Sequence, residues 1–113
     1  MIEKIIIDWL REKLGVPAYL EEPEKPPKEY VIIDKLGSTE NDLITSATIV
    51  VQSYSVGLCE AAELNAKVKK TMAESVSQGD ICRCVCTSDY NYTDTETKRY
   101  RYQAVFDIIY YEE

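Results

Sequence analysis

The chain has 113 residues, of which 20 are acidic and 13 basic, giving a net charge of −7, and it contains no histidine. This length fits one domain spanning residues 1–113, and an apolar fraction of 45% is that of a folded protein. The acidic balance disfavours direct, non-specific binding to nucleic acid, which depends on Lys and Arg.

Residues 2–14 have the pattern of an amphipathic helix that Gly15 and Pro17 end. Apolar residues recur every three or four positions, and most charged residues fall between them. Ile7 lies off this stripe, so we expect the helix to be covered on a second side as well. The stripe consists of Ile2, Ile5, Ile6, Trp9, Leu10 and Leu14.

The same segment lacks the features of a secretory signal peptide. It carries acidic residues among its apolar ones and has no small-residue cleavage site. No apolar run in the chain approaches the roughly 20 residues that cross a bilayer. We therefore expect a cytosolic protein with no membrane partner, in which the cysteines are reduced.

The next segment combines a short strand with a proline-rich connection. Residues 16–22, "VPAYLEE", have the pattern of a short strand. Residues 21–29, "EEPEKPPKE", have three prolines and six charges, which predict an extended loop that cannot join a central sheet. Two interpretations stay open for this loop: a solvated connection, or an arm that reaches a neighbouring subunit.

Residues 30–54 predict a β-hairpin. Its first strand, residues 29–37, is expected to end at Gly37, and residues 38–42 have the composition of a turn. Residues 43–55 form the expected second strand. Alternation along it places a first set of residues on one face and a second set on the other. The first set is Leu43, Ala47, Ile49 and Val51; the second is Ile44, Ser46, Thr48, Val50, Gln52 and Tyr54.

A second helix is expected over residues 56–78, with Ser55 as its N-cap and Gly79 at its C-terminal end. Its inward stripe is Ala61, Leu64, Val68, Met72 and Val76.

Two strands close the chain, over residues 80–92 and from Tyr100 onward, joined by a polar turn at 93–97. The element order is therefore helix, short strand, two strands, helix, two strands. This order predicts an α+β fold with a mostly antiparallel sheet of four to five strands and both helices on one face.

Catalytic chemistry finds little support in the residue types. Without histidine, neither a Ser-His-Asp triad nor a Cys–His pair is possible. No glycine-rich phosphate loop is present. Acidic residues are abundant, but no pattern places two of them opposite each other. We expect no catalytic residue and no cofactor, so the protein is not expected to be an enzyme.

The cysteines do not form a metal-binding motif. Cys82, Cys84 and Cys86 share one face of a strand at intervals of about 7 Å, and Cys59 of the second helix is a possible neighbour. Zinc sites usually take two ligands from a CxxC knuckle, which this sequence lacks. We expect no metal, and we expect these cysteines to be small buried residues packed under a helix.

Four tyrosines flank the last turn: Tyr90, Tyr92, Tyr100 and Tyr102. One interpretation is cross-strand aromatic pairing within the hairpin. A second is a protein–protein interface, where tyrosine is enriched. A third is stacking on nucleic-acid bases, for which the basic surround reduces to Lys98, Arg99 and Arg101.

Residues 1–38, 47–72 and 88–110 together resemble the small tail-terminator proteins, also called tail-completion or head–tail joining proteins, of long-tailed bacteriophages and prophages. The features that carry the resemblance are the amphipathic first helix, "VPAY", the spacing P..PP..Y, "QSY" before the second helix, and "RYQAVFDI" near the end. None of these is a catalytic signature, and it is their common order that is specific.

The resemblance implies a sandwich of helices on a mostly antiparallel sheet. It also implies a protein that is monomeric in solution or forms a ring, expected to be a hexamer, on the finished tail tube. Such a ring ends tube polymerisation and docks to the head connector, without cofactor or reaction. The protein is then expected in the virion tail or neck, and in the host cytoplasm during assembly. DNA passes through the acidic lumen without specific binding.

The docking elements are expected in loop 23–28 and turn 93–97, with residues that flank them. The candidate interface residues are Pro23, Lys25, Pro26, Pro27, Lys28, Tyr90, Tyr92, Asp94, Glu96, Lys98, Arg99 and Arg101. Two alternatives remain: another neck or tail component, such as a head-closure protein or tube subunit, and a small bacterial enzyme or binding domain. The latter predicts a pocket with converging polar groups.

Overall fold

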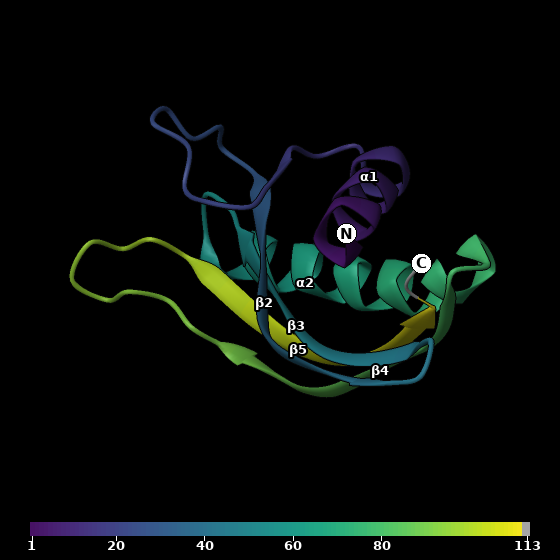
Figure 1. The fold of residues 1–113 in the computed structure, drawn as a ribbon. Helices are drawn as coiled ribbons and strands as arrows, with labels where there is room; N and C mark the ends of the chain where they lie inside the picture. Colours follow the sequence, from purple (N-terminus) through teal and green to yellow (C-terminus); the bar gives the residue numbers. More distant parts are fainter. Residues whose placement is uncertain (112–113) are drawn as a thin grey trace.

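A computed structural model describes residues 1–111 and has the predicted α+β fold (Figure 1). Its elements are α1 (Ile2–Leu14), β1 (Ala18–Tyr19), β2 (Tyr30–Asn41), β3 (Ile44–Tyr54), α2 (Leu58–Ala73), a 3-10 helix (Glu74–Gln78), β4 (Ile81–Asn91) and β5 (Arg101–Tyr111). The element order and the mostly antiparallel sheet are confirmed.

The five strands form one sheet in the order β1-β2-β3-β5-β4. β1 pairs with β2 in parallel through Ala18 and Tyr19, and every other pairing is antiparallel. Figure 1 shows both helices on the same face of a curved sheet, so none of the described residues forms a helix over the opposite face. The connection between β4 and β5 projects beyond the rest of the sheet, and the molecule measures 45 × 25 × 23 Å.

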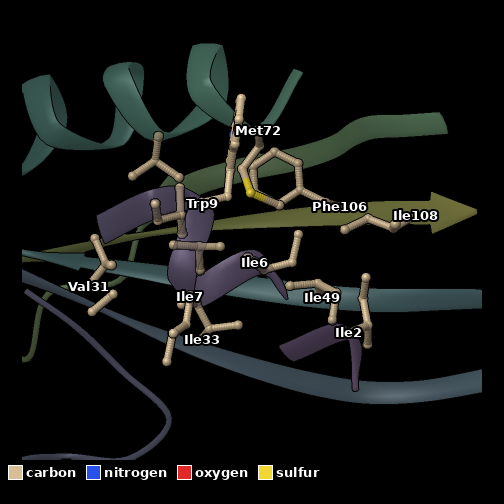
Figure 2. Packing of buried hydrophobic residues seen from close by; sticks show 14 of the residues in the cluster. Ile2, Ile6, Ile7, Trp9, Val31, Ile33, Ile49, Met72, Phe106 and Ile108 are labelled. Carbon is tan, nitrogen blue, oxygen red and sulfur yellow. The ribbon is translucent and has the colours of Figure 1, made fainter. Parts of the chain in front are cut away.

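The core lies between the helices and the sheet (Figure 2). The apolar stripe of α1 is buried at Ile2, Ile6 and Leu10, and Ile7 is buried too, which confirms that this helix is covered on a second side. Trp9 joins the two helices, because its indole Nε1 donates a 2.8 Å hydrogen bond to the carbonyl oxygen of Thr71 on α2.

Side chains along β5 alternate between the two faces of the sheet, so every second residue of this strand lies in the core. Its buried residues are Ala104, Phe106, Ile108 and Tyr110, and the residues between them lie on the uncovered face. Among the described residues, no helix is long and apolar enough to cross a membrane.

The first helix ends at Gly15, as predicted. Gly15 has a φ of 71°, in the left-handed region that favours glycine, and its N–H bonds to the carbonyl oxygen of Arg11. The guanidinium of Arg11 also donates to the carbonyl oxygen of Ala18, at 2.7 Å from Nη2. These contacts turn the chain from α1 directly into the short edge strand β1.

The predicted end of the first hairpin strand at Gly37 is wrong. β2 continues to Asn41, and Ser38 to Asn41 pair with β3 although their composition is that of a turn. A bulge between Lys35 and Gly37 absorbs the irregularity. The turn lies instead around Asp42, which has a φ of 59°. Leu43, expected on one face of the second strand with Ala47, Ile49 and Val51, is 71% exposed because it lies in this turn.

The second helix is shorter than predicted. It begins at Leu58 with Gly57 as N-cap, and Ser55 is not the cap because its hydroxyl donates to the Glu29 carboxylate at 3.1 Å. The α-helix ends at Ala73 and continues as the 3-10 helix to Gln78. The change of helical pitch leaves Val76 exposed, and Gly79, with a φ of 86°, ends the segment.

The cysteines are not buried as predicted. Cys82 and Cys86 are exposed and only Cys84 packs partly against the core. The physical reason is that β4 is an edge strand at the margin of the helical layer. Burial raises the pKa of the Cys84 thiol to about 11.

Candidate functional site

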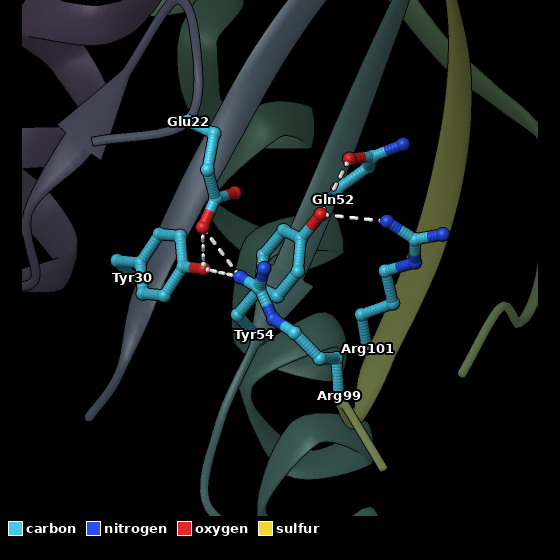
Figure 3. A network of polar contacts seen from close by, with 6 residues as sticks. All are labelled: Glu22, Tyr30, Gln52, Tyr54, Arg99 and Arg101. Carbon is cyan, nitrogen blue, oxygen red and sulfur yellow. Dashed lines mark hydrogen bonds and ion pairs between the residues drawn. The ribbon is translucent and has the colours of Figure 1, made fainter. Parts of the chain in front are cut away.

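A clasp of three side chains joins the connection between β1 and β2 to the connection between β4 and β5 (Figure 3). Arg99 Nη2 lies 2.5 Å from Glu22 Oε1, and the same guanidinium donates to the Tyr30 hydroxyl. The Tyr30 hydroxyl in turn donates to Glu22 Oε1 at 2.8 Å. Two segments far apart in the sequence are therefore fixed at one end of the sheet. We call Glu22, Tyr30 and Arg99 the clasp.

The charges of the clasp support one another. The hydrogen bond to Glu22 raises the pKa of the Arg99 guanidinium, so this residue stays charged. Burial, followed by the hydrogen bond to Glu22, raises the pKa of Tyr30, which therefore stays a neutral phenol. The ion pair itself is substantially exposed, so its net contribution to stability is about 1 kcal/mol or less.

Aromatic stacking extends the clasp across the sheet. The rings of Tyr30 on β2 and Tyr54 on β3 lie 4.6 Å apart at an angle of 3°. The guanidinium carbons of Arg99 and Arg101 lie 5.1 and 5.6 Å from the centre of the Tyr54 ring. Arg101 also donates to the Tyr54 hydroxyl at 2.7 Å. These cation–π and stacking contacts keep two arginines in place over a tyrosine that is 5% exposed.

Amides continue this network to the edge strand. The Tyr54 hydroxyl donates to Gln52 Oε1 at 3.1 Å, and Gln52 Nε2 donates to Gln103 Oε1 at 2.9 Å. Gln103 Nε2 then donates to the Tyr90 hydroxyl at 2.5 Å. The network therefore crosses β2, β3, β5 and β4 on the face that carries no helix.

Of the three interpretations given for the tyrosines that flank the last turn, the first is cross-strand ring pairing, and no such pair is found among the described residues. Tyr90 and Tyr92 form an edge-to-face contact along one strand, with ring centres 6.0 Å apart. Tyr90 has Gln103 opposite it, while Tyr102 pairs with Asn91 on the other face of the sheet. Tyr92 packs instead under Arg101, whose guanidinium carbon lies 4.5 Å from the ring centre.

The predicted turn at 93–97 is ordered by Asp94. Its carboxylate accepts hydrogen bonds from the backbone N–H of Glu96 at 3.0 Å and of Thr97 at 3.4 Å. Hydrogen bonds, first that from the Thr97 side chain, hold the pKa of Asp94 below its usual value. Asp94 therefore shapes the turn, whereas Glu96 and Lys98 are exposed on it.

A cleft of about 280 Å³ lies between the two connections. Its lining includes five of the predicted interface residues: Pro26, Pro27, Lys28, Lys98 and Arg99. Pro23 lines a different hollow, beside α1, and Lys25 is exposed. The two predicted docking elements thus meet at one end of the molecule, which we call the clasp end.

A second hollow, of about 550 Å³, lies on the uncovered face at the opposite end of the sheet. Its lining includes the hydroxyl-bearing residues Thr39, Ser46, Thr48 and Thr87, together with Arg83 and Asp107. Thr48 donates to Asp107 at 3.4 Å. The guanidinium of Arg83 is exposed and has no hydrogen bond or ion pair among residues 1–111.

The sequence-based prediction missed Glu22, Tyr30, Gln52, Tyr54 and Gln103. Two of these carried a usable signal, since Tyr30 closes the spacing P..PP..Y and Tyr54 belongs to "QSY". No local pattern links Glu22 to Arg99, because their contact depends on how two separate connections fold.

Within residues 1–111, no group of three or more Cys, Asp or Glu side chains is arranged to hold a metal ion. The fold and the site define an α+β protein with a one-sided sheet and a network of tyrosine, arginine and amide groups across its open face. No protein-family model matches this sequence, and no curated protein matches it either.

Proposed function

We propose that this protein is a structural phage-assembly protein of the tail-terminator type. It caps the finished tail tube, ends tube polymerisation and offers the docking surface for the head connector. It acts as a ring of copies, six by the resemblance, in the virion tail or neck, and it is present in the host cytoplasm during assembly.

One observation carries this proposal: the clasp fixes the two expected docking elements into a single end of the molecule. The connection 20–29 and residues 98–100, which directly follow the turn 93–97, line one cleft, and the two segments are joined through Glu22 and Arg99. A docking surface whose loops are already ordered loses less conformational entropy when it binds. Tyr90, Tyr92 and Arg99 are exposed at or beside this end, and tyrosine and arginine are enriched at protein interfaces.

The proposed activity makes and breaks no covalent bond. The tyrosines and arginines of the network hold one another by hydrogen bonds, stacking and cation–π contacts, which are structural roles. The net charge of −7 favours passage of DNA through a ring without adhesion to its wall. Neither a cofactor nor a metal takes part in this account.

The proposal is tested with purified tails that lack this protein. Tails incubated with the protein are expected to keep uniform length and to join purified heads, as seen by negative-stain electron microscopy. Tails incubated with buffer are expected to continue growing when tube subunits are added. A protein that neither stops tube growth nor supports head joining contradicts the proposal.

The same assay separates the terminator from the other neck components. A head-closure protein binds heads and leaves tube growth unaffected, whereas a tube subunit co-polymerises along the tail. A terminator binds at the ends of isolated tails and stops their growth. Binding to isolated tails and to isolated heads, measured by co-sedimentation, therefore decides among the three.

The second candidate is a small binding domain, and the hollow at Arg83 favours it. The Arg83 guanidinium, which has no hydrogen bond or ion pair within residues 1–111, lies among hydroxyls and is suited to a ligand that carries a carboxylate. Titration with short-chain carboxylic acids, followed by NMR of the Arg83 side chain, tests this candidate. Saturable shifts that Arg83→Gln abolishes support it, and no shifts at millimolar ligand exclude it.

A further inference from the structure

Within residues 1–111, no strand lies beside two edges of the sheet. β4 is the last strand and pairs only with β5, so its outer edge is free along its length. On the other side, β1 covers β2 only at Val31 and Ile32. The part of β2 that follows, from Ile33 to Asn41, pairs only with β3 among the described residues. Long free edges are sites at which another strand adds.

Bulges restrict the regular part of each free edge. On β2, the bulge between Lys35 and Gly37 leaves 37–41 as the uninterrupted segment. On β4, bulges before Arg83 and after Cys86 leave 83–86 as the uninterrupted segment. A bulge disrupts the ladder locally, so a partner strand pairs best with these two segments.

The two segments lie on the same rows of the sheet. The row that begins at Ser38 on β2 passes through β3 and β5 and ends at Cys84 on β4. The adjacent row begins at Thr39 and ends at Arg83. Since the four strands β2, β3, β5 and β4 alternate in direction, the two free edges run in opposite directions. A second copy placed beside the first in the same orientation therefore meets it with antiparallel strands.

We propose that segment 83–86 of one copy pairs antiparallel with segment 37–41 of the next copy, with Cys84 opposite Ser38. The contact is heterologous, because each copy contributes two different edges, and such contacts close into a ring when the rotation suits it. This inference rests on the proposed ring and names the surfaces that form it. In such a ring, the sheet face that carries no helix points to the same side in every copy.

The short pairing segments explain how one chain serves both as a monomer and as a ring. A contact of so few backbone hydrogen bonds is weak between two free copies. In a closed ring every copy makes two contacts, and a tail tube that binds several copies raises their effective concentration. Assembly is therefore expected on the tail end rather than in dilute solution.

Disulfide trapping tests the pairing with one substitution. Ser38 has its side chain on the same face as Cys84, because their row partners Ala47 and Ile108 are both buried under the helices. The variant Ser38→Cys, concentrated and treated with diamide long enough for the slowly reacting Cys84 thiol to oxidise, is expected to form a ladder of disulfide-linked species on a non-reducing gel. Mass spectrometry of the linked species is expected to show a disulfide between the new thiol at position 38 and Cys84 of another copy. Directly opposite residues of antiparallel strands lie within disulfide distance.

The matched control is Thr39→Cys, whose new thiol lies on the opposite face of the same edge. It is expected to give no more linked species than the wild type. If Thr39→Cys links as readily as Ser38→Cys, or if the wild type gives only Cys84–Cys84 dimers, the proposed pairing is wrong. Absence of linking at all concentrations and on tail ends also overturns it.

The outcomes also separate this inference from the proposed function. If Ser38→Cys caps tails but does not link, the pairing is wrong and the terminator function stands. If Ser38→Cys links as a ladder but does not cap tails, the pairing stands and the terminator function is wrong.

Discussion

Arg99 Nη2 lies 2.5 Å from Glu22 Oε1, although the two residues are 77 positions apart in the sequence. This contact joins the proline-rich connection before β2 to the turn region before β5. Both connections were expected to dock to other proteins, and they form a single end of the molecule. The proposed function requires that the clasp end is ordered before it binds the tail tube or the head connector.

We predict that Glu22→Gln loosens the clasp end with little effect on global stability. The neutral amide weakens the bond to Arg99, and because the pair is substantially exposed, the free energy of unfolding is expected to fall by less than about 1 kcal/mol. Hydrogen exchange of residues 92–100 is expected to accelerate, and fewer tails are expected to be capped. The control is Glu24→Gln, an exposed carboxylate of the same connection. Equal exchange rates in the two variants would show that the clasp does not order this end.

We predict that Tyr54→Ala is strongly destabilising, by about 3 kcal/mol, because it removes a buried ring that stacks on Tyr30 and lies under two arginines. Tyr54→Phe keeps the ring and removes the hydrogen bonds of the hydroxyl, so a loss of about 1 kcal/mol is expected. Urea unfolding measures both values. A Tyr54→Phe variant as unstable as Tyr54→Ala would contradict the role given to the stack.

We predict that Phe106→Ala and Leu43→Ala differ by several kcal/mol in their effect on unfolding. Phe106 is 1% exposed in the core, and its truncation is expected to cost about 3–5 kcal/mol. Leu43 is 71% exposed in the β2–β3 turn, so its truncation is expected to change stability by less than about 0.5 kcal/mol. Thermal unfolding compares them, and a large loss for Leu43→Ala would mean that another surface covers this turn.

We predict that Cys84 reacts slowly with iodoacetamide at pH 8. Burial raises its pKa from 9.0 to about 11, so its thiolate fraction is roughly a hundredfold smaller than that of an unperturbed thiol. Because the folded-state pKa lies above the unfolded one, this group's contribution to stability is full below pH 9 and is lost as the pH rises through 11. Alkylation followed by peptide mass spectrometry measures the rate, with urea-unfolded protein as the control. Equal rates in folded and unfolded protein would contradict the burial of this thiol.

Periodicity in the sequence was sufficient for the elements that pack on the core. The stripe of α1 and the alternation of β3 predict residues that are buried in the structure, such as Leu10 and Ile49, because the covered face of each element is mostly apolar. Residues 38–41 have turn composition, yet they lie in β2 because pairing with β3 overrides local preference. Ser55 has the chemistry of an N-cap, but Glu29 competes for its hydroxyl.

The candidate site was predictable only in part. Composition was enough to select both connections as candidate docking elements. The first is rich in proline and charge and the second in tyrosine and charge, and each of these signals lies within one segment of the sequence. The contact between Glu22 and Arg99 has no such signal, because it arises only when β2 and β5 take their places in the sheet. The same holds for the amide pair of Gln52 and Gln103, which depends on strand register.

Cryo-electron microscopy of the protein bound to the end of a purified tail tests the central claim most directly. The account predicts a ring of copies on the tail end, with the clasp end of each copy in contact with the tail tube or with the head connector. A tail end without a ring, or a ring whose clasp ends all face solvent in joined particles, would contradict it.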